Sequence, residues 1–134
     1  MSVLVFTENW DGKFKKLSFE LASYASKVAE MLNTNVVALS IGNVDENELK
    51  KLGGYGVKKV ISINNDALKS LDNQAYTSVI AEIAQKEGSK VVVLSNNNTG
   101  KGIAPRLSVR LKAAIGAGVS QLPLNVNALL IHFQ

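Results

Sequence analysis

The chain alternates between short apolar runs and segments in which apolar residues recur every three or four positions. The apolar runs cover residues 2–7, 36–41, 58–63 and 91–95. Runs of this length, rich in β-branched residues, predict buried strands. The last of them, VVVLS, is the most continuous, which is typical of a central parallel strand covered on both faces. GAGVSQL at 116–122 predicts a short fifth strand.

The segments with helical spacing separate these runs and predict amphipathic helices. The predicted helices cover residues 18–32, 48–56, 75–88 and about 103–113. Asp45 and Glu48 are spaced as a capping box before the second helix. Pro105 is expected in the first turn of the last helix, where its missing amide hydrogen is not needed.

Strands that alternate with helices predict a three-layer α/β/α domain with an open, mainly parallel, five-stranded Rossmann-like sheet. A chain of 134 residues fits one such domain, expected over residues 1–122, with a C-terminal tail at 123–134. Ligands of such sheets bind beyond the carboxyl ends of the strands. This rule selects three loops, at residues 8–14, 42–44 and 96–102.

Composition excludes several kinds of chemistry. The chain has no cysteine, which excludes disulfides, thiolate catalysis and iron–sulfur ligation by its own residues. Its only histidine, His132, lies in an apolar segment, so neither a catalytic imidazole pair nor a metal site is expected. No apolar run approaches the roughly 20 residues that cross a bilayer, and the first residues do not resemble a leader. A cytoplasmic location is therefore expected.

Charge is distributed unevenly along the chain. The formal net charge is +4, and Glu87 is the last acidic residue. The cations beyond it are Lys90, Lys101, Arg106, Arg110 and Lys112. This end of the domain should attract anions. Nucleic-acid binding is not expected, because the same region contains a single aromatic residue, Phe133.

The loop after the fourth predicted strand is the candidate ligand site. Helix-start amides carry partial positive charge, and glycines permit unusual backbone angles. The candidate anion- or nucleotide-binding residues are Asn97, Asn98, Thr99, Gly100, Lys101 and Gly102. In the alternative reading, Asn98 or Thr99 is an ordinary helix cap and the asparagines form turns. The loop is not a P-loop, because Ser95 stands where the first glycine is needed and Gly102 where a hydroxyl is needed.

Other residues suggest contacts rather than catalysis. Trp10 lies in the first loop and is either a local lid or an interface anchor. Arg106 and Arg110, one helical turn apart, either bridge to a partner or cover the core with their stems. Glu8 and Asp11 are the acids at the expected rim, where solvated loop carboxylates are common. No catalytic residue and no metal ligand is predicted.

Three segments together resemble a known family. They are VLVFTENWDGKFKKLSFELASYASKVAEML, LKKLGGYGVKKVISI and VVVLSNNNTGKGIAPRLSVRLKAAIGAGV. In this order, over nearly the whole chain, they are similar to the amino-terminal domain of the alpha subunit of electron-transfer flavoproteins. Lys101 and Gly102 stand where the family commonly has Arg-Asp, and Gln121 stands where it has an acid. Polar contacts at those positions are therefore not carried over.

The resemblance implies an adenine nucleotide alpha hydrolase-like fold and a heterodimer with a similarly folded beta subunit. FAD would be held mainly by a second alpha-subunit domain following residue 134, and AMP by the beta subunit. The complete protein would carry electrons from dehydrogenases, such as the acyl-CoA dehydrogenases of fatty acid oxidation, to a membrane oxidoreductase or another acceptor.

The expected function is therefore subunit assembly and placement of the flavin domain, without chemistry or bound FAD in this chain alone. The alternative is an adenine-nucleotide-binding module of the same fold, using the loop at 96–102 and the first-strand loop. An enzyme comes third, because only Glu8 and Asp11 could activate water. Without its partner subunit, the chain is expected to be able to form a homodimer.

Overall fold

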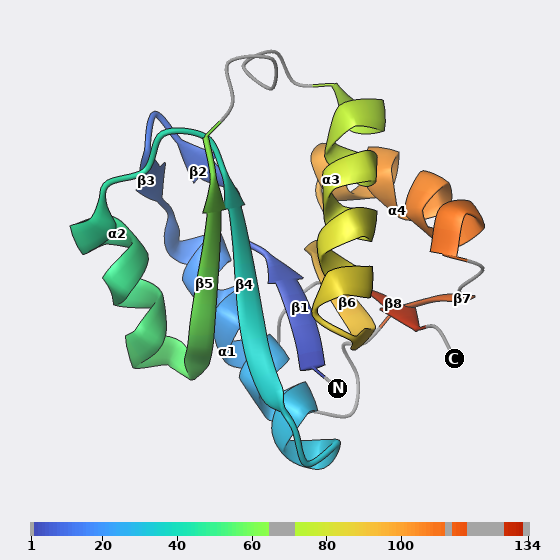
Figure 1. Cartoon of the computed structure of the whole chain (residues 1–134), viewed down its shortest axis with the longest axis horizontal. Coiled ribbons are helices and arrows are strands. Elements are labelled where there is room, and N and C mark those ends of the chain that lie inside the picture. Colours follow the sequence, from blue (N-terminus) through green and yellow to red (C-terminus); the bar gives the residue numbers. More distant parts are fainter. Residues whose placement is uncertain (1, 65–71, 112–113, 118–127, 133–134) are drawn as a thin grey trace.

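The computed structural model describes residues 2–64, 72–111, 114–117 and 128–132 (Figure 1). Its main-sheet strands are β1 (Ser2–Phe6), β4 (Asn35–Ile41), β5 (Val57–Ile63), β6 (Ser89–Ser95), β7 (Ala114–Ala117) and β8 (Ala128–His132). The helices are α1 (Lys16–Met31), α2 (Glu46–Lys50), the 3-10 helix η1 (Lys51–Tyr55), α3 (Asn73–Lys86) and α4 (Asn98–Leu111). Strands β2 (Asn9–Trp10) and β3 (Lys13–Phe14) form a separate hairpin.

The sheet has the strand order β5-β4-β1-β6-β8-β7 in the part of the chain that the structure describes. Strands β5, β4, β1 and β6 are parallel, whereas β8 is antiparallel to both of its neighbours. The four long predicted strands and the mainly parallel α/β fold are thus confirmed. Each parallel link passes through helical structure, as right-handed crossovers require.

The C-terminal part of the sheet differs from the prediction. The fifth strand, predicted at 116–122, is instead β7 at Ala114–Ala117, and residues 118–127 lie outside the described residues. The segment expected as a tail contributes β8, which pairs with β6 from Val91↔His132 to Ser95↔Ala128. The described sheet therefore has six strands rather than five.

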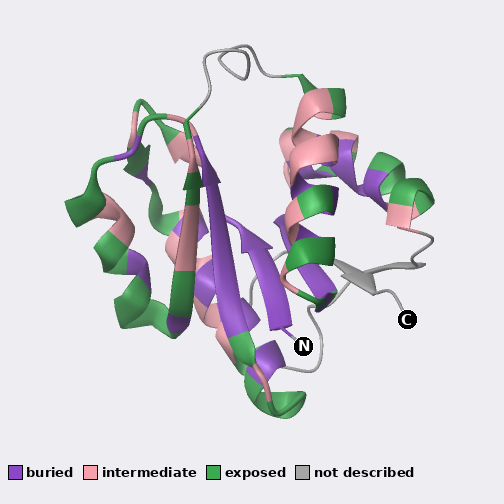
Figure 2. Cartoon of the chain, viewed as in Figure 1, coloured by how far each residue is buried: buried purple, intermediate pink, exposed green. Residues whose placement is uncertain are grey.

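Helices cover both faces of the sheet (Figure 1). One face packs against α1 and η1 through a cluster that includes Val5, Leu21, Tyr24 and Leu52. The opposite face packs against α3 and α4 through the second cluster, which includes Leu4, Ile80, Ile103 and Leu107. Burying one such side chain contributes about 1.5–3 kcal/mol. Figure 2 shows the consequence, since β1 and β4 are buried along almost their whole length.

The predicted capping box does not form. The Asp45 side chain makes no capping hydrogen bond. The Glu48 side chain has a different partner, since its Oε2 accepts from the backbone amide of Phe14 at 2.8 Å. Helix α3 begins two residues before the predicted start. Its cap is Asp72, which accepts from the amides of Gln74 (2.9 Å) and Ala75 (3.4 Å).

Helix α4 begins at Asn98, about five residues before the predicted start. Most of the residues predicted to form a ligand loop are therefore its first turns, and Pro105 lies in the helix interior rather than in the first turn. The prediction was wrong because asparagine and glycine have low helix propensity. The tertiary contacts of this segment outweigh that preference.

The predicted loop at 8–14 contains the β2–β3 hairpin. Asp11 (φ 52°) and Gly12 (φ 79°) both have positive φ, as a two-residue type I′ turn requires. An Asp-Gly pair is a known signal for this turn.

No helix among the described residues is both long enough and apolar enough to span a bilayer.

Candidate functional site

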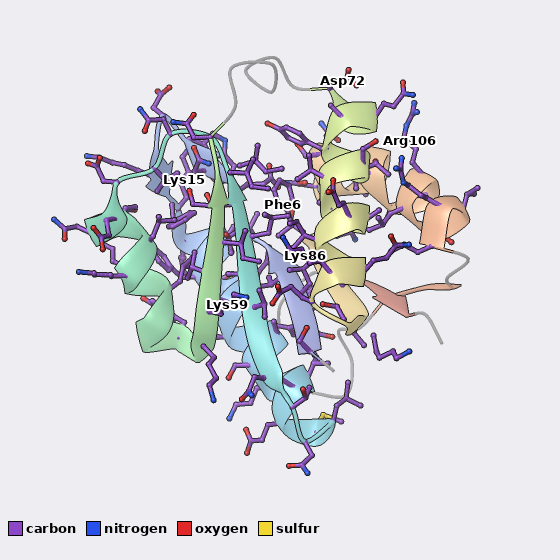
Figure 3. The ribbon with its side chains drawn as sticks, viewed as in Figure 1. Phe6, Lys15, Lys59, Asp72, Lys86 and Arg106 are labelled. Carbon is purple, nitrogen blue, oxygen red and sulfur yellow. The ribbon has the colours of Figure 1, made fainter. Side chains whose placement is uncertain are left out.

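The topology directs attention to the carboxyl ends of β1 and β6, which are neighbours in the sheet. The chain leaves β1 towards α1 on one face and leaves β6 towards α4 on the opposite face. This divergence makes a topological switch point, where ligands of open α/β sheets usually bind. Figure 3 shows Phe6 at the end of β1, facing the α3–α4 side.

A side-chain carboxylate lies across this switch point. Glu8 Oε1 accepts hydrogen bonds from Ser95 Oγ at 3.0 Å and from Asn97 Nδ2 at 2.9 Å. The Glu8 backbone carbonyl accepts a further bond from Ser18 Oγ at 2.5 Å. Glu8 is half-buried and Ser95 is buried. The half-buried acid thus joins the segments that follow β1 and β6, and we call Glu8, Ser95 and Asn97 the switch-point cluster.

Asn97 also caps α4. Its Oδ1 accepts from the Gly100 amide and its backbone carbonyl accepts from the Lys101 amide, each at 2.9 Å. The cap is therefore Asn97, rather than Asn98 or Thr99 as predicted. One of the helix-start amides that an anion would use, that of Gly100, is therefore already bonded within the chain.

The glycines of this helix are explained by close packing. A Cβ added at Gly100 would overlap the carbonyl oxygen of Ser95, and one at Gly102 would overlap the side-chain amide of Asn73 in α3. Both glycines let α4 approach its neighbours, and neither is among the residues with positive φ. Anion or nucleotide binding by the six candidate residues stays a prediction.

The charged side chain of the switch-point cluster is the Glu8 carboxylate, which also influences Tyr76. Tyr76 of α3 packs its ring edge-on against Phe6, with centroids 5.8 Å apart. Burial raises the pKa of the Tyr76 hydroxyl, and the nearby Glu8 carboxylate raises it further. The same carboxylate would repel a phosphate placed at the start of α4, since like charges oppose one another.

The hairpin with Trp10 is held from two sides. Asn9 Nδ2 donates to the Ile41 carbonyl at 2.8 Å, and Asn9 Oδ1 accepts from the Gly12 amide at 3.2 Å. On the other side, Phe14 donates to Glu48 as described above. Trp10 is 37% exposed, and Lys15 Nζ lies 4.9 Å from its ring centroid. An exposed tryptophan on a tethered hairpin fits an interface anchor better than a moving lid, and the role of Trp10 stays a prediction.

Glu48 of α2 accepts the hydrogen bond from the hairpin and also forms an ion pair within the α2–η1 segment. Lys51 Nζ lies 2.7 Å from Glu48 Oε1, and the Glu48 side chain is 11% exposed. The hydrogen bond from Lys51 lowers the pKa of the Glu48 carboxyl, and the Phe14 amide lowers it further. Sequence reasoning missed this role, because spacing alone assigned Glu48 to a capping box.

The arrangement offers hydrogen bonding but little catalytic chemistry. Within the described ranges, no three His, Asp or Glu side chains lie close enough to hold a metal ion. Ser95 was not predicted as part of a site, although the adjacency of parallel strand ends could have suggested its pairing with Glu8. Arg106 and Arg110, the other predicted interface residues, are exposed on α4.

The whole sequence is similar to known proteins. The family model described as "Electron transfer flavoprotein domain" matches residues 3–133. The "Acryloyl-CoA reductase electron transfer subunit beta" of Anaerotignum propionicum is 31% identical over 125 residues, covering 93% of this chain and 34% of the relative. The "Electron transfer flavoprotein subunit alpha" of Thermoanaerobacterium thermosaccharolyticum is 29% identical over 130 residues, covering 97% and 39%.

The chain thus spans between a third and two fifths of the length of these curated relatives. Among solved structures, a universal stress protein from Archaeoglobus fulgidus superposes with a TM-score of 0.54 at 10% identity, covering 82% of this chain and 87% of that protein. At this identity the likeness concerns the fold alone. It agrees with the adenine nucleotide alpha hydrolase-like architecture expected from the sequence.

Proposed function

The chain belongs to the electron transfer flavoprotein domain family, and we propose that it is the amino-terminal domain of an alpha-type subunit. Its role is to support assembly with a beta-type subunit and to position the flavin-bearing part of the complex. The domain acts as part of an electron carrier and performs no reaction itself. Relatives named as electron transfer subunits support this role.

One observation supports a scaffolding role over ligand binding. The switch point, where ligands of this architecture usually bind, contains the Glu8 carboxylate bonded to Ser95 and Asn97. These groups satisfy one another, and the acid disfavours a phosphate at the start of α4. The nucleotide-binding alternative therefore has less support than the assembly role.

The remaining parts of the proposal concern the whole complex. FAD is bound outside this chain, and AMP is bound in the beta-type subunit. Dehydrogenases, including those acting on acyl-CoA in fatty acid oxidation, supply electrons, and an acceptor oxidoreductase removes them. The complex works in the cytoplasm. These statements extend the family assignment and each needs its own test.

The test uses the purified chain. When it is mixed with FAD and desalted, the chain should retain no flavin absorbance. When it is mixed with a beta-type subunit from the same source, it should elute as a 1:1 complex in size-exclusion chromatography with light scattering. Calorimetry with AMP and ATP provides the discriminating control. Micromolar binding of either nucleotide, without complex formation, would contradict the assembly role and favour the nucleotide module.

A further inference from the structure

We propose that the outer face of α4 is a docking surface for an acidic face of the beta-type subunit. This surface, which we call the α4 outer face, consists of Lys101, Pro105, Arg106, Val109 and Arg110, all exposed. The inference rests on the proposed function and adds the location and the chemistry of the contact. The first argument comes from the division of α4 into two faces.

The inner face of α4 already has its partners. Gly100, Ile103, Ala104 and Leu107 are buried against the sheet and α3. The outer residues recur at intervals of three and four positions, so they form one continuous strip on the helix surface. That strip faces away from the core and is available to another protein.

The positive charge of the strip is not neutralised within the described part of the chain. The ion pairs found there use Lys16, Lys27, Lys50, Lys51 and Lys59, and none uses a cation of α4. Helix α4 itself contains no acidic residue. Arg106 and Arg110 are four residues apart, and like charges at this spacing destabilise a helix by a few tenths of a kcal/mol. A partner that supplies carboxylates would remove this repulsion.

Arg110 is oriented by a neutral group. Its Nη1 donates to Ser78 Oγ of α3 at 2.9 Å. A hydroxyl does not compensate the charge of the guanidinium, and among the described residues this is the one hydrogen bond that its five N–H donors make. An arginine held in this way has lost part of its side-chain freedom before binding, so it is suited to a bidentate contact with a carboxylate.

An apolar centre distinguishes this strip from a simple solvated basic helix. Val109 is 81% exposed, the largest value for a large hydrophobic residue in the described part of the chain, and Pro105 lies one turn earlier on the same face. Apolar contact points surrounded by charged residues are typical of protein interfaces. Nucleic acid fits less well, because α4 contains no aromatic residue on which a base could stack.

The strip is well separated from the hairpin with Trp10. Figure 3 labels Lys15 and Arg106 on opposite sides of the molecule. A charge change on α4 should therefore leave the hairpin intact. This separation lets one variant test the α4 outer face alone.

The experiment measures affinity for the beta-type subunit by calorimetry. The test variant is Arg106→Glu/Arg110→Glu. The control is Lys58→Glu/Lys90→Glu, which makes the same change in net charge at exposed positions near the starts of β5 and β6, outside α4 and in no ion pair among the described residues. The test variant should bind at least about tenfold more weakly, because attraction becomes repulsion, and the control should stay within about threefold of wild type. Wild-type affinity should also fall as salt rises from about 0.05 M to about 0.5 M.

The outcomes separate the two proposals. If wild type does not bind the beta-type subunit, both the proposed function and this inference are overturned. If wild type binds and the test variant binds equally well, or the control loses as much affinity, only the docking surface is overturned. Tight binding of a single-stranded oligonucleotide, abolished by the same variant, would assign the strip to nucleic acid instead.

Unchanged thermal unfolding of the charge variant would show that it is folded. A second variant, Val109→Ser, leaves the charges of the strip intact and should cause a smaller loss of affinity.

Discussion

The carboxylate of Glu8 lies 2.9 Å from the side-chain amide nitrogen of Asn97, although 89 residues separate them in the chain. Asn97 uses its other side-chain atom to cap α4. A single amide group thus connects the segment that follows β1 to the first turn of the helix that follows β6. The switch-point cluster therefore contributes to the stability of the domain, whether or not a ligand binds there.

Replacing Glu8 with alanine should lower the free energy of unfolding by about 1–3 kcal/mol, because Ser95 and Asn97 lose their shared acceptor. Glu8→Gln should cost less, since an amide oxygen can still accept. The measurement is urea unfolding followed by circular dichroism. Glu82→Ala, at an exposed position of α3, is the control and should change the value by less than about 0.5 kcal/mol. Equal effects at positions 8 and 82 would show that the cluster contributes nothing.

Gly100→Ala should be among the most destabilising small substitutions in the chain. Its Cβ would overlap the backbone oxygen of Ser95, which cannot move without disturbing β6. We expect a loss of more than about 2 kcal/mol. Gly53→Ala is the matched control, because its Cβ would meet nothing within 4 Å. A stable Gly100→Ala protein would mean that α4 can shift away from the strand end.

Some elements of the fold can be predicted from neighbouring residues alone, and others depend on contacts between distant parts of the chain. Strand β6 was predictable because a strand buried on both faces has a continuous apolar run. Helix α1 was predictable because a helix buried on one face has apolar residues every three or four positions. The start of α4 was not, because Gly100 and Gly102 indicate a loop when only neighbouring residues are considered. These glycines are instead required by tertiary packing, since a side chain at either position would overlap Ser95 or Asn73.

Strand order was likewise not encoded in local pattern. The apolar run at Ala128–His132 could equally have been a tail, and only pairing with β6 makes it an inner strand of the sheet. The hairpin, in contrast, could have been predicted from Asp11-Gly12. The strand-end rule selected the loops that contain Glu8 and Asn97, but spacing along the chain carries no information about contacts between the loops, so the hydrogen bonds of Glu8 could not be inferred.

Glu48 should make stability depend on pH in the acid range. Its folded pKa lies below the ordinary value of 4.5, so its contribution is complete above that value and is lost as pH falls through the lower, folded pKa. Glu48→Gln should lower the free energy of unfolding by about 1 kcal/mol near neutral pH. The difference from wild type should shrink as pH falls below about 4.5, and it should disappear only once Glu48 is protonated in the folded protein, at a pH below that value.

Glu46→Gln is the control for this pH series. Glu46 lies 3.8 Å from Lys50, and both side chains are largely exposed, so the pair contributes little. Its stability curve should follow wild type within about 0.5 kcal/mol at each pH. A Glu48 effect that is constant across the acid range would indicate lost packing rather than a lost charge.

The two aspartates that precede helices should respond differently to alanine. Asp72 accepts from the amides of Gln74 and Ala75, whereas the Asp45 side chain makes no capping bond. Asp72→Ala should therefore cost about 1 kcal/mol, and Asp45→Ala only the few tenths that a charge near a helix start contributes. Chemical unfolding gives both values, and amide hydrogen exchange at Gln74 and Ala75 should accelerate only in Asp72→Ala. If Asp45→Ala proves the more costly change, the capping box read from the sequence forms in solution after all, and the link from Glu48 to the Phe14 amide would have to be reconsidered.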